Sequence, residues 1–308
     1  MVTGKIFPLF SFLMANGPQN PMKRLFSLAI FIIICTTVDA QTPKFSTTVL
    51  NGEFGIAAGA AHYFGDLNTQ SWMNNPKPAA MFFFKKQFGP YIGLRLTGTY
   101  AGLGYSDRYT DILVQRIRNL SFNTHIFELA LGGEFNFFRF IPGEPGYNFT
   151  PYLTLSAGVF NYDPYAFLQG EKHFLRNLGT EGQGSAKYPD RKPYSSTAFS
   201  FPLGMGFKVN VTPRLNLFLE VAHRFTTTDY LDDVSLTYAG LEAFSPLPDG
   251  SPSPAMLLQD RSGELVRVPI GIAGRQRGNS QRTDQFITAM IGVSLNLTSY
   301  VCPSPSTL

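Results

Sequence analysis

The chain has 308 residues and a formal net charge of +4 at pH 7, from 25 basic and 21 acidic residues. Charged residues make up 15% of it, against about a quarter in ordinary soluble domains, whereas aromatic residues reach 14% with 29 Phe and 14 Tyr. This balance fits a β structure that faces lipid or encloses a ligand. Because no run of Lys and Arg follows the N-terminal segment, nucleic acid is not an implied partner.

The first predicted element is a targeting signal. From Met22 the chain reads MKRLFSLAIFIIICTTVDA, which is a basic start, an apolar core and a V-x-A end suited to a signal peptidase. We therefore expect translation to start at Met22 and cleavage to occur before Gln41, so that residues 1–40 are an extension plus signal peptide and residues 41–308 the mature domain. Cys302 is then the one remaining cysteine, which excludes an intramolecular disulfide or a thiolate metal cluster.

Alternation of apolar and polar residues predicts strands through the rest of the chain. In RLNLFLEVAHRF, residues 214–225, aliphatic side chains fall on one face and Asn, Glu and Arg on the other. Eight strands are expected, near 51–64, 77–87, 91–101, 121–138, 150–161, 198–211, 214–226 and 283–297. Each reaches the roughly 9 to 11 residues that a tilted membrane strand requires.

The connections between these strands alternate in length. The second, fourth and sixth are short, with the sequences FGP, FIPGEPGYN and TPR, whereas the first, third, fifth and seventh are long. An even strand count with short turns opposite long loops predicts an all-β fold, an eight-stranded antiparallel transmembrane barrel of the OmpA/OmpX type in the outer membrane, in contact with its lipid. A soluble lipocalin-like barrel is the alternative, and long loops confined to one end disfavour it.

Charged residues fall on the strand faces opposite the aliphatic stripe. They are Glu53, Arg95, Glu128, Glu134, Lys208, Glu220 and Arg224. An eight-stranded barrel has internal space only for side chains, so we expect ion pairs to close the lumen and disfavour a small-solute porin. The alternative is that these residues are the solvent-facing side of a soluble sheet.

Aromatic residues cluster near the predicted strand ends, as interfacial girdles do. The set is Phe82, Phe83, Phe84, Tyr91, Tyr100, Tyr105, Phe135, Phe137, Phe138 and Phe140. Part of it would serve equally well as core packing.

Catalytic and metal chemistry receive little support. His62, His125 and His223 lie on the apolar face by parity, where some outer-membrane lipid hydrolases place a His-Ser-acid site. Ser121 and Ser200 are candidate hydroxyls, yet no acid is evident on that face, so a lipid-modifying enzyme based on a histidine stays the alternative function. No cofactor is expected, and the aspartates of TTDYLDDVS match no calcium-loop spacing.

Four blocks of sequence resemble a known family. They are YFGDLN at 63–68, LRNLGTEGQG at 175–184, TDYLDDVS at 228–235 and QRGN at 276–279 followed by Asp284. In string and order they resemble the PorG-like outer-membrane proteins of Bacteroidota type IX secretion. The resemblance implies a non-enzymatic eight-stranded barrel associated with the secretion and gliding apparatus, with periplasmic ring proteins of the PorK and PorN kind as partner.

All four blocks map to external loops or the strand ends beside them. The residues expected to order these loops or to interact there are Asp66, Glu181, Asp229, Asp232, Asp233, Arg275, Arg277 and Asn279. Because the first, seventh and eighth strands are neighbours in a closed barrel, their loops can meet at the rim. We hypothesise that Arg224, Arg275 and Arg277, with backbone donors, neutralise the three aspartates of DYLDD, and that Asn at positions 232 and 233 would loosen the last loop.

Overall fold

The computed structural model describes residues 48–71 and 73–300. The predicted signal peptide over 1–40 and Cys302 lie outside these residues. Within the described ranges, no helix has the length and apolar character needed to cross a membrane.

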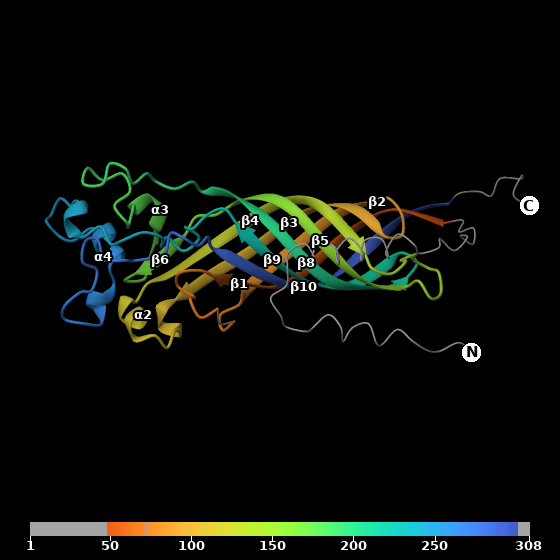
Figure 1. Cartoon of the computed structure of the whole chain (residues 1–308), viewed down its shortest axis with the longest axis horizontal. Coiled ribbons are helices and arrows are strands. Elements are labelled where there is room, and N and C mark those ends of the chain that lie inside the picture. The colour runs from red at the N-terminus through yellow and green to blue at the C-terminus, as the bar shows by residue number, and fades with distance from the viewer. Residues whose placement is uncertain (1–47, 72, 301–308) are drawn as a thin grey trace, which may run out of the picture. The chain divides into compact units, whose positions relative to one another are not determined.

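Eight long antiparallel strands form a closed barrel (Figure 1). They are β1 (Thr48–Phe64), β2 (Lys77–Gln87), β3 (Ile92–Ser106), β4 (Ser121–Asn136), β5 (Phe149–Asn161), β8 (Thr197–Thr212), β9 (Leu215–Thr226) and β10 (Gln285–Tyr300). Each pairs with the next of these strands, and β1 pairs with β10 from Phe64↔Gln285 to Thr48↔Tyr300, which closes the ring. The predicted eight-stranded antiparallel fold is confirmed, and β3 runs to Ser106, beyond its expected end at residue 101.

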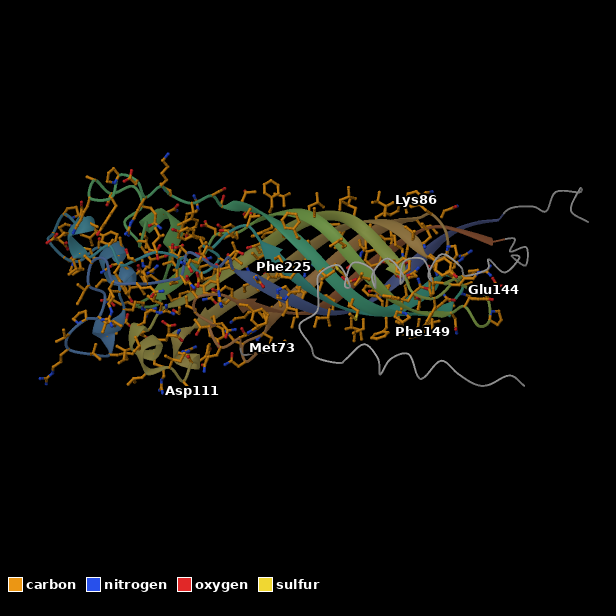
Figure 2. All side chains as sticks on the ribbon, in the orientation of Figure 1. Met73, Lys86, Asp111, Glu144, Phe149 and Phe225 are labelled. Atoms are coloured by element: carbon orange, nitrogen blue, oxygen red, sulfur yellow. The ribbon has the colours of Figure 1, made fainter. Side chains whose placement is uncertain are left out.

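The two faces of the barrel differ in chemistry. In β8, exposed and buried residues alternate, with apolar side chains at the exposed positions from Phe199 to Val211 and Ser200, Lys208 and Asn210 among the buried ones. The sticks in Figure 2 show side chains projecting from the barrel wall, including those of Phe149 and Phe225. A continuous exposed apolar belt of this kind is stable against hydrocarbon and would promote association in water. The protein is therefore a β-barrel of the outer membrane.

Three of the rings predicted at the membrane interfaces lie inside instead. Phe83 faces the lumen, where the Arg95 guanidinium lies 4.0 Å from the ring centroid. Tyr105 is buried, because β3 continues past the expected strand end, and Phe140 is buried with Lys208 Nζ 4.8 Å from its ring centroid. The rings of that set that are clearly exposed are Phe82, Phe84, Tyr91, Phe135, Phe137 and Phe138.

The long loops leave one end of the barrel and the short turns close the other (Figure 1). The long loops are 65–76, 107–120, 162–196 and 227–284, and the turns are 88–91, 137–148 and 213–214. The loops carry short elements that alternation did not predict. These are the hairpin of β6 (Tyr165–Leu168) and β7 (Glu171–Phe174), the helices α2 (Leu113–Arg118), α3 (Leu175–Leu178) and α4 (Pro254–Gln259), and the 3-10 turns η2 (Asp107–Tyr109), η3 (Leu241–Ala243) and η4 (Ser262–Glu264).

The lipid-facing belt can be tested at Leu155, which lies midway along β5 with 63% of its surface exposed. An arginine near the bilayer midplane destabilises a barrel by about 2 to 4 kcal/mol. We expect Leu155→Arg to lower the free energy of unfolding from lipid vesicles by that amount. Leu247→Arg, in the last external loop, is the control and should change it by less than about 0.5 kcal/mol. Equal effects at the two positions would contradict a membrane-facing β5.

Candidate functional site

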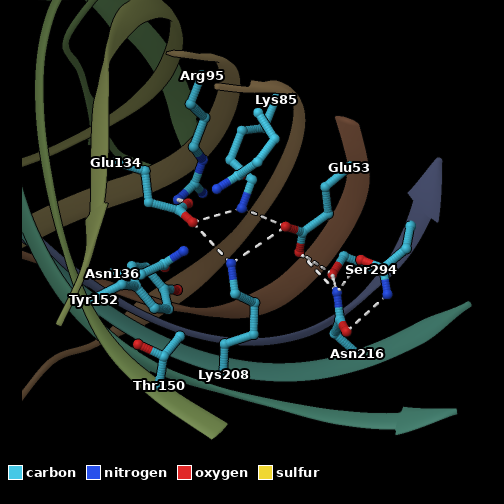
Figure 3. Close-up of polar contacts among 12 residues, drawn as sticks. Glu53, Lys85, Arg95, Glu134, Asn136, Thr150, Tyr152, Lys208, Asn216 and Ser294 are labelled. Carbon is cyan, nitrogen blue, oxygen red and sulfur yellow. Dashed lines mark hydrogen bonds and ion pairs between the residues drawn. The ribbon is translucent and has the colours of Figure 1, made fainter. Parts of the chain in front are cut away.

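The part of the lumen nearest the short turns holds two carboxylates and two ammonium groups in alternation (Figure 3). Lys85 Nζ lies 2.6 Å from Glu134 Oε1 and also pairs with Glu53. Lys208 Nζ lies 2.8 Å from Glu134 Oε1 and 3.2 Å from Glu53 Oε2. All four side chains are buried, so each charge depends on the others for compensation.

Two further ion pairs occupy the lumen toward the loops. Arg95 Nη1 lies 2.5 Å from Glu220 Oε2, which also accepts a hydrogen bond from the Tyr152 hydroxyl at 3.0 Å. Arg224 Nε lies 2.8 Å from Glu128 Oε2. The seven charged residues predicted to face the lumen are therefore all buried inside it and brought into ion pairs.

Lys85 is the lumen residue that sequence reasoning missed. It stands between three phenylalanines and the exposed Lys86, so two adjacent cations obscure the alternation. Counting in steps of two from the buried Met81 would have placed it inside. With Lys85 included, four bases face four acids in this network, and its formal charge is zero.

Side chains fill the lumen almost completely. The cavity between Arg95 and Arg224 has a volume of about 20 Å³. Such a space holds about one water molecule. This close packing of paired side chains argues against the porin alternative.

Above the lumen, the four long loops meet in one buried polar cluster. We call it the loop junction and define it by Asp66, Arg118, Glu181, Asp233 and Arg277, with at least one residue from each loop. These residues come from the four sequence blocks described above, except Arg118. Arg118 was missed because it lies at the end of α2, in a loop that carries none of the blocks.

Glu181 joins the third long loop to the fourth. Its carboxylate accepts hydrogen bonds from the backbone N–H of Ser235 at 2.9 Å and of Leu236 at 3.0 and 3.1 Å. Arg277 Nη1 lies 3.1 Å from the same carboxylate and donates to the Asp233 carbonyl at 2.5 Å. A buried carboxylate with this many donors fixes both segments in one arrangement.

Arg118 joins the first, second and fourth loops. It pairs with Asp107 at 2.7 Å and donates to the carbonyl oxygens of Arg277 at 2.8 Å and Asp66 at 3.1 Å. The Asp66 carboxylate in turn accepts from the Asn279 N–H at 2.6 Å. Gly278 is required beside them, because a Cβ there would collide with the Asp66 carboxylate and the Ser235 backbone.

Asp232 and Asp284 share one hydroxyl. The Tyr63 hydroxyl oxygen lies 2.6 Å from Asp232 Oδ2 and 2.9 Å from Asp284 Oδ1, yet it has only one hydrogen to donate. Burial raises the pKa of both carboxyls well above their usual range, and nearby carboxylates raise it further. The arrangement is satisfied when one of the two carboxyls is protonated and donates to the hydroxyl oxygen.

The other two aspartates of DYLDD differ in their partners. Burial raises the pKa of Asp233 to about 6, although Arg277 at 3.7 Å and the hydroxyls of Thr180 and Tyr194 oppose the shift. Burial raises the pKa of Asp229 to about 7. The segment is therefore a buried, proton-binding part of the loop structure.

The arginines proposed to neutralise these aspartates are placed differently. Arg277 pairs with Asp233, but Arg224 points into the lumen and pairs with Glu128, as its strand parity requires. Arg275 is exposed and donates to the Ile270 carbonyl at 3.3 Å. In the described part of the chain, no group of three or more His, Cys, Asp or Glu is arranged to hold a metal ion.

The outward-facing histidines contact neutral polar groups. His62 lies 3.2 Å from the Asn68 amide nitrogen, and His223 lies 2.7 Å from Gln285 Oε1. His125 lies 2.9 Å from the Tyr100 hydroxyl, on an exposed part of β4. Ser200, a candidate hydroxyl for the lipid-hydrolase alternative, lies inside the lumen, where it donates to Glu128 at 2.6 Å. Its placement on the apolar face was wrong.

A large hollow lies beside the loop junction. It has a volume of about 890 Å³ and lies between the first long loop, α2 and residues 270–285. We call it the rim hollow and define it by Phe64, Val114, Tyr238, Arg275, Arg282 and Gln285 among its lining residues. Sequence reasoning did not anticipate it, because its walls come from three separate segments.

The lumen charges can be tested by removing one cation. Lys85→Met leaves Glu53 and Glu134 with Lys208 alone between them, and breaking a buried ion pair in this way destabilises by about 3 to 5 kcal/mol. We expect urea unfolding in detergent micelles to show that loss. Lys85→Met with Glu53→Gln should recover most of it, and Lys86→Met is the exposed control. A double variant as unstable as the single one would contradict the compensation.

Four aspartates of the last external loop predict a pH dependence. Their folded-state pKa values are raised, well above the usual range for Asp232 and Asp284, to about 6 for Asp233 and to about 7 for Asp229. The stability that they contribute is therefore complete below about pH 4 and is lost as the pH rises through the raised values. We expect limited proteolysis of the external loops to be faster at pH 8 than at pH 5.

Asp232→Asn should flatten this pH profile, because an amide can donate to the Tyr63 oxygen as a protonated carboxyl does. Asp233→Asn should loosen the loop at every pH, since its amide nitrogen cannot accept the hydrogen bond that the second carboxyl oxygen accepts. The expectation that both changes loosen the last loop is therefore tested by two measurements, the pH profile for Asp232→Asn and the protection at each pH for Asp233→Asn. Asp249→Asn, at an exposed position, is the control. Loops that become more protected as the pH rises would disprove the shared proton.

Comparison with known proteins gives one family match and several structural likenesses. No curated protein matches the chain. Neisserial surface protein A has 11% identity and a TM-score of 0.38, covering 82% of this chain and 98% of its own. Ail of Yersinia pestis has 11% identity and a TM-score of 0.36, covering 81% of this chain and 100% of its own. The N-terminal barrel of Pseudomonas aeruginosa OprF has 10% identity and a TM-score of 0.34, covering 80% of this chain and 98% of its own. The family described as a domain of unknown function, DUF6089, matches residues 23–244, and the chain belongs to this family.

Proposed function

We propose that this outer-membrane barrel is a non-enzymatic component or anchor of a type IX secretion and gliding apparatus, with periplasmic ring proteins of the PorK and PorN kind as its partner. The observation that carries the proposal is the convergence of the four sequence blocks at or beside the loop junction. The four blocks that carry the resemblance to PorG-like proteins thus lie together in space and stabilise one arrangement of the loops. Four matching segments scattered over the surface would support the resemblance much less.

The closed lumen favours an anchoring role over transport. Four acidic and four basic side chains with their hydrogen-bond partners occupy the interior, and the cavity between Arg95 and Arg224 admits about one water molecule. A barrel that conducts no solute acts through what it binds on either side of the membrane. Its rigidity suits a fixed attachment point for a larger assembly.

The turn over 137–148 is a preformed surface on the periplasmic side. The Gly143 N–H donates to Asn210 Oδ1 at 2.9 Å, and the Arg139 guanidinium lies 4.9 Å from the Tyr147 ring centroid. Pro145 and Gly146 are exposed at its tip, next to Glu144 (Figure 2). A turn held in one conformation loses little conformational entropy on binding a partner.

Site-specific photocrosslinking in intact cells tests the partner. A photoreactive residue at Glu144 or Pro145 should capture a periplasmic ring protein, because both positions lie on the turn that faces the periplasm. The same residue at Asp249, in an external loop, is the matched control and should capture none.

Deletion of the chromosomal copy should reduce export of type IX substrates, and the Lys86→Met barrel should restore it. Crosslinks at the turn only to unrelated envelope proteins, with export unchanged on deletion, would refute the secretion role. The barrel assignment would be unaffected by that outcome.

A further inference from the structure

The rim hollow begins where the lipid-facing surface of the barrel ends. Phe64 and Gln285 pair across β1 and β10 and form part of its lining. Their chain neighbours Tyr63 and Phe286 are buried inside the barrel, so Phe64 and Gln285 project outward by parity. A ligand in the hollow would therefore sit at the level of the outer-leaflet head groups.

Two arginines on the hollow are available to an anion. Arg282 is exposed, and its side chain forms no hydrogen bond or ion pair with any described residue. Arg275 is exposed, and with the described residues its side chain makes one hydrogen bond, of 3.3 Å, to a carbonyl oxygen. Asp66 is the acidic residue among the lining residues, and the Asn279 N–H already satisfies one of its oxygens. The free charge of the hollow is therefore positive.

Tyr238 supplies an independent indication of a missing partner. It is only 1% exposed and lines the hollow, and its hydroxyl has no hydrogen-bond partner among the described residues. Its backbone is held by hydrogen bonds of 2.9 Å to Arg275 and Gly274. Buried hydroxyls without partners are rare in folded proteins, and a small shift of the side chains that cover this one would let a ligand oxygen accept its hydrogen.

The remaining lining suits a sugar as well as an anion. Neutral amides are contributed by Gln115, Gln276 and Gln281, and apolar contacts by Val114 and Ile270. Amides bind sugar hydroxyls, and arginines bind phosphate oxygens through paired N–H groups. The volume of about 890 Å³ falls within the usual range of small-ligand sites, about 300 to 1,000 Å³.

We propose that the rim hollow binds the phosphorylated saccharide head group of an outer-leaflet glycolipid. Arg275 and Arg282 contact the phosphate, Tyr238 donates to a ligand oxygen, and the amides contact sugar hydroxyls. This inference is independent of the secretion role, because a barrel of any function in this membrane can hold a lipid at its rim.

Calorimetric titration of the purified full-length barrel in detergent micelles tests the site. The probes are a soluble glucosamine disaccharide bisphosphate, the same disaccharide without phosphate, and inorganic phosphate. We expect the bisphosphate to bind, and Arg275→Gln with Arg282→Gln to weaken it by about tenfold or more, since charge-assisted contacts are lost. Arg116→Gln with Arg267→Gln removes two exposed charges from the same loops outside the hollow and should leave affinity within about twofold.

Tyr238→Phe provides a second variant that removes a single oxygen. It should weaken bisphosphate binding by about fivefold without lowering the thermal midpoint, because its hydroxyl has no partner among the described residues to lose. If inorganic phosphate bound as tightly as the bisphosphate, the ligand would not be a glycolipid. If the unphosphorylated disaccharide bound as tightly as the bisphosphate, the site would not recognise phosphate. Unchanged affinity in the Tyr238→Phe barrel, or no binding of any probe, would overturn the site itself.

Discussion

The need to balance buried charge in a narrow lumen constrains the rest of the structure. Glu53 and Glu134 are stabilised inside by Lys85 and Lys208, which lie between them. Side chains alternate across a strand, so a one-residue slip of β2 would turn Lys85 toward lipid and an aromatic ring inward. Charge pairing and the lipid-facing belt thus specify the same register. The register in turn determines where each strand ends and where the loops can meet.

The loop junction also holds buried acids, but they are neutralised in a different way. Together with the neighbouring Asp232 and Asp284, its acids outnumber Arg118 and Arg277. Backbone N–H groups satisfy Glu181 and Asp66, and a proton shared through Tyr63 satisfies Asp232 and Asp284. The lumen is neutral through fixed charges, whereas the junction reaches neutrality by binding protons. The external part of the molecule is therefore expected to respond to pH.

Local alternation predicted the strands and seven of the eight lumen charges, because both follow from a period of two residues. It missed Lys85, where two lysines follow three phenylalanines, and the short helices and hairpin of the loops, which have no such period. Strand parity placed Arg224 correctly in the lumen, whereas its assignment to the rim aspartates relied only on proximity in sequence. Arg118 and the rim hollow depend on three separate loops meeting, and no local pattern encodes that meeting.

The closure of the ring has a consequence for biogenesis. The Glu53 carboxylate on β1 receives hydrogen bonds or ion pairs from Lys85, Lys208, Asn216 and Ser294, which belong to β2, β8, β9 and β10. A nascent barrel that lacks its last strands would leave the Glu53 anion with Lys85 as the one remaining partner of these four. Insertion is therefore favourable only for the whole set of strands, so the chain is expected to enter the membrane as a unit once its C-terminal strand has been delivered.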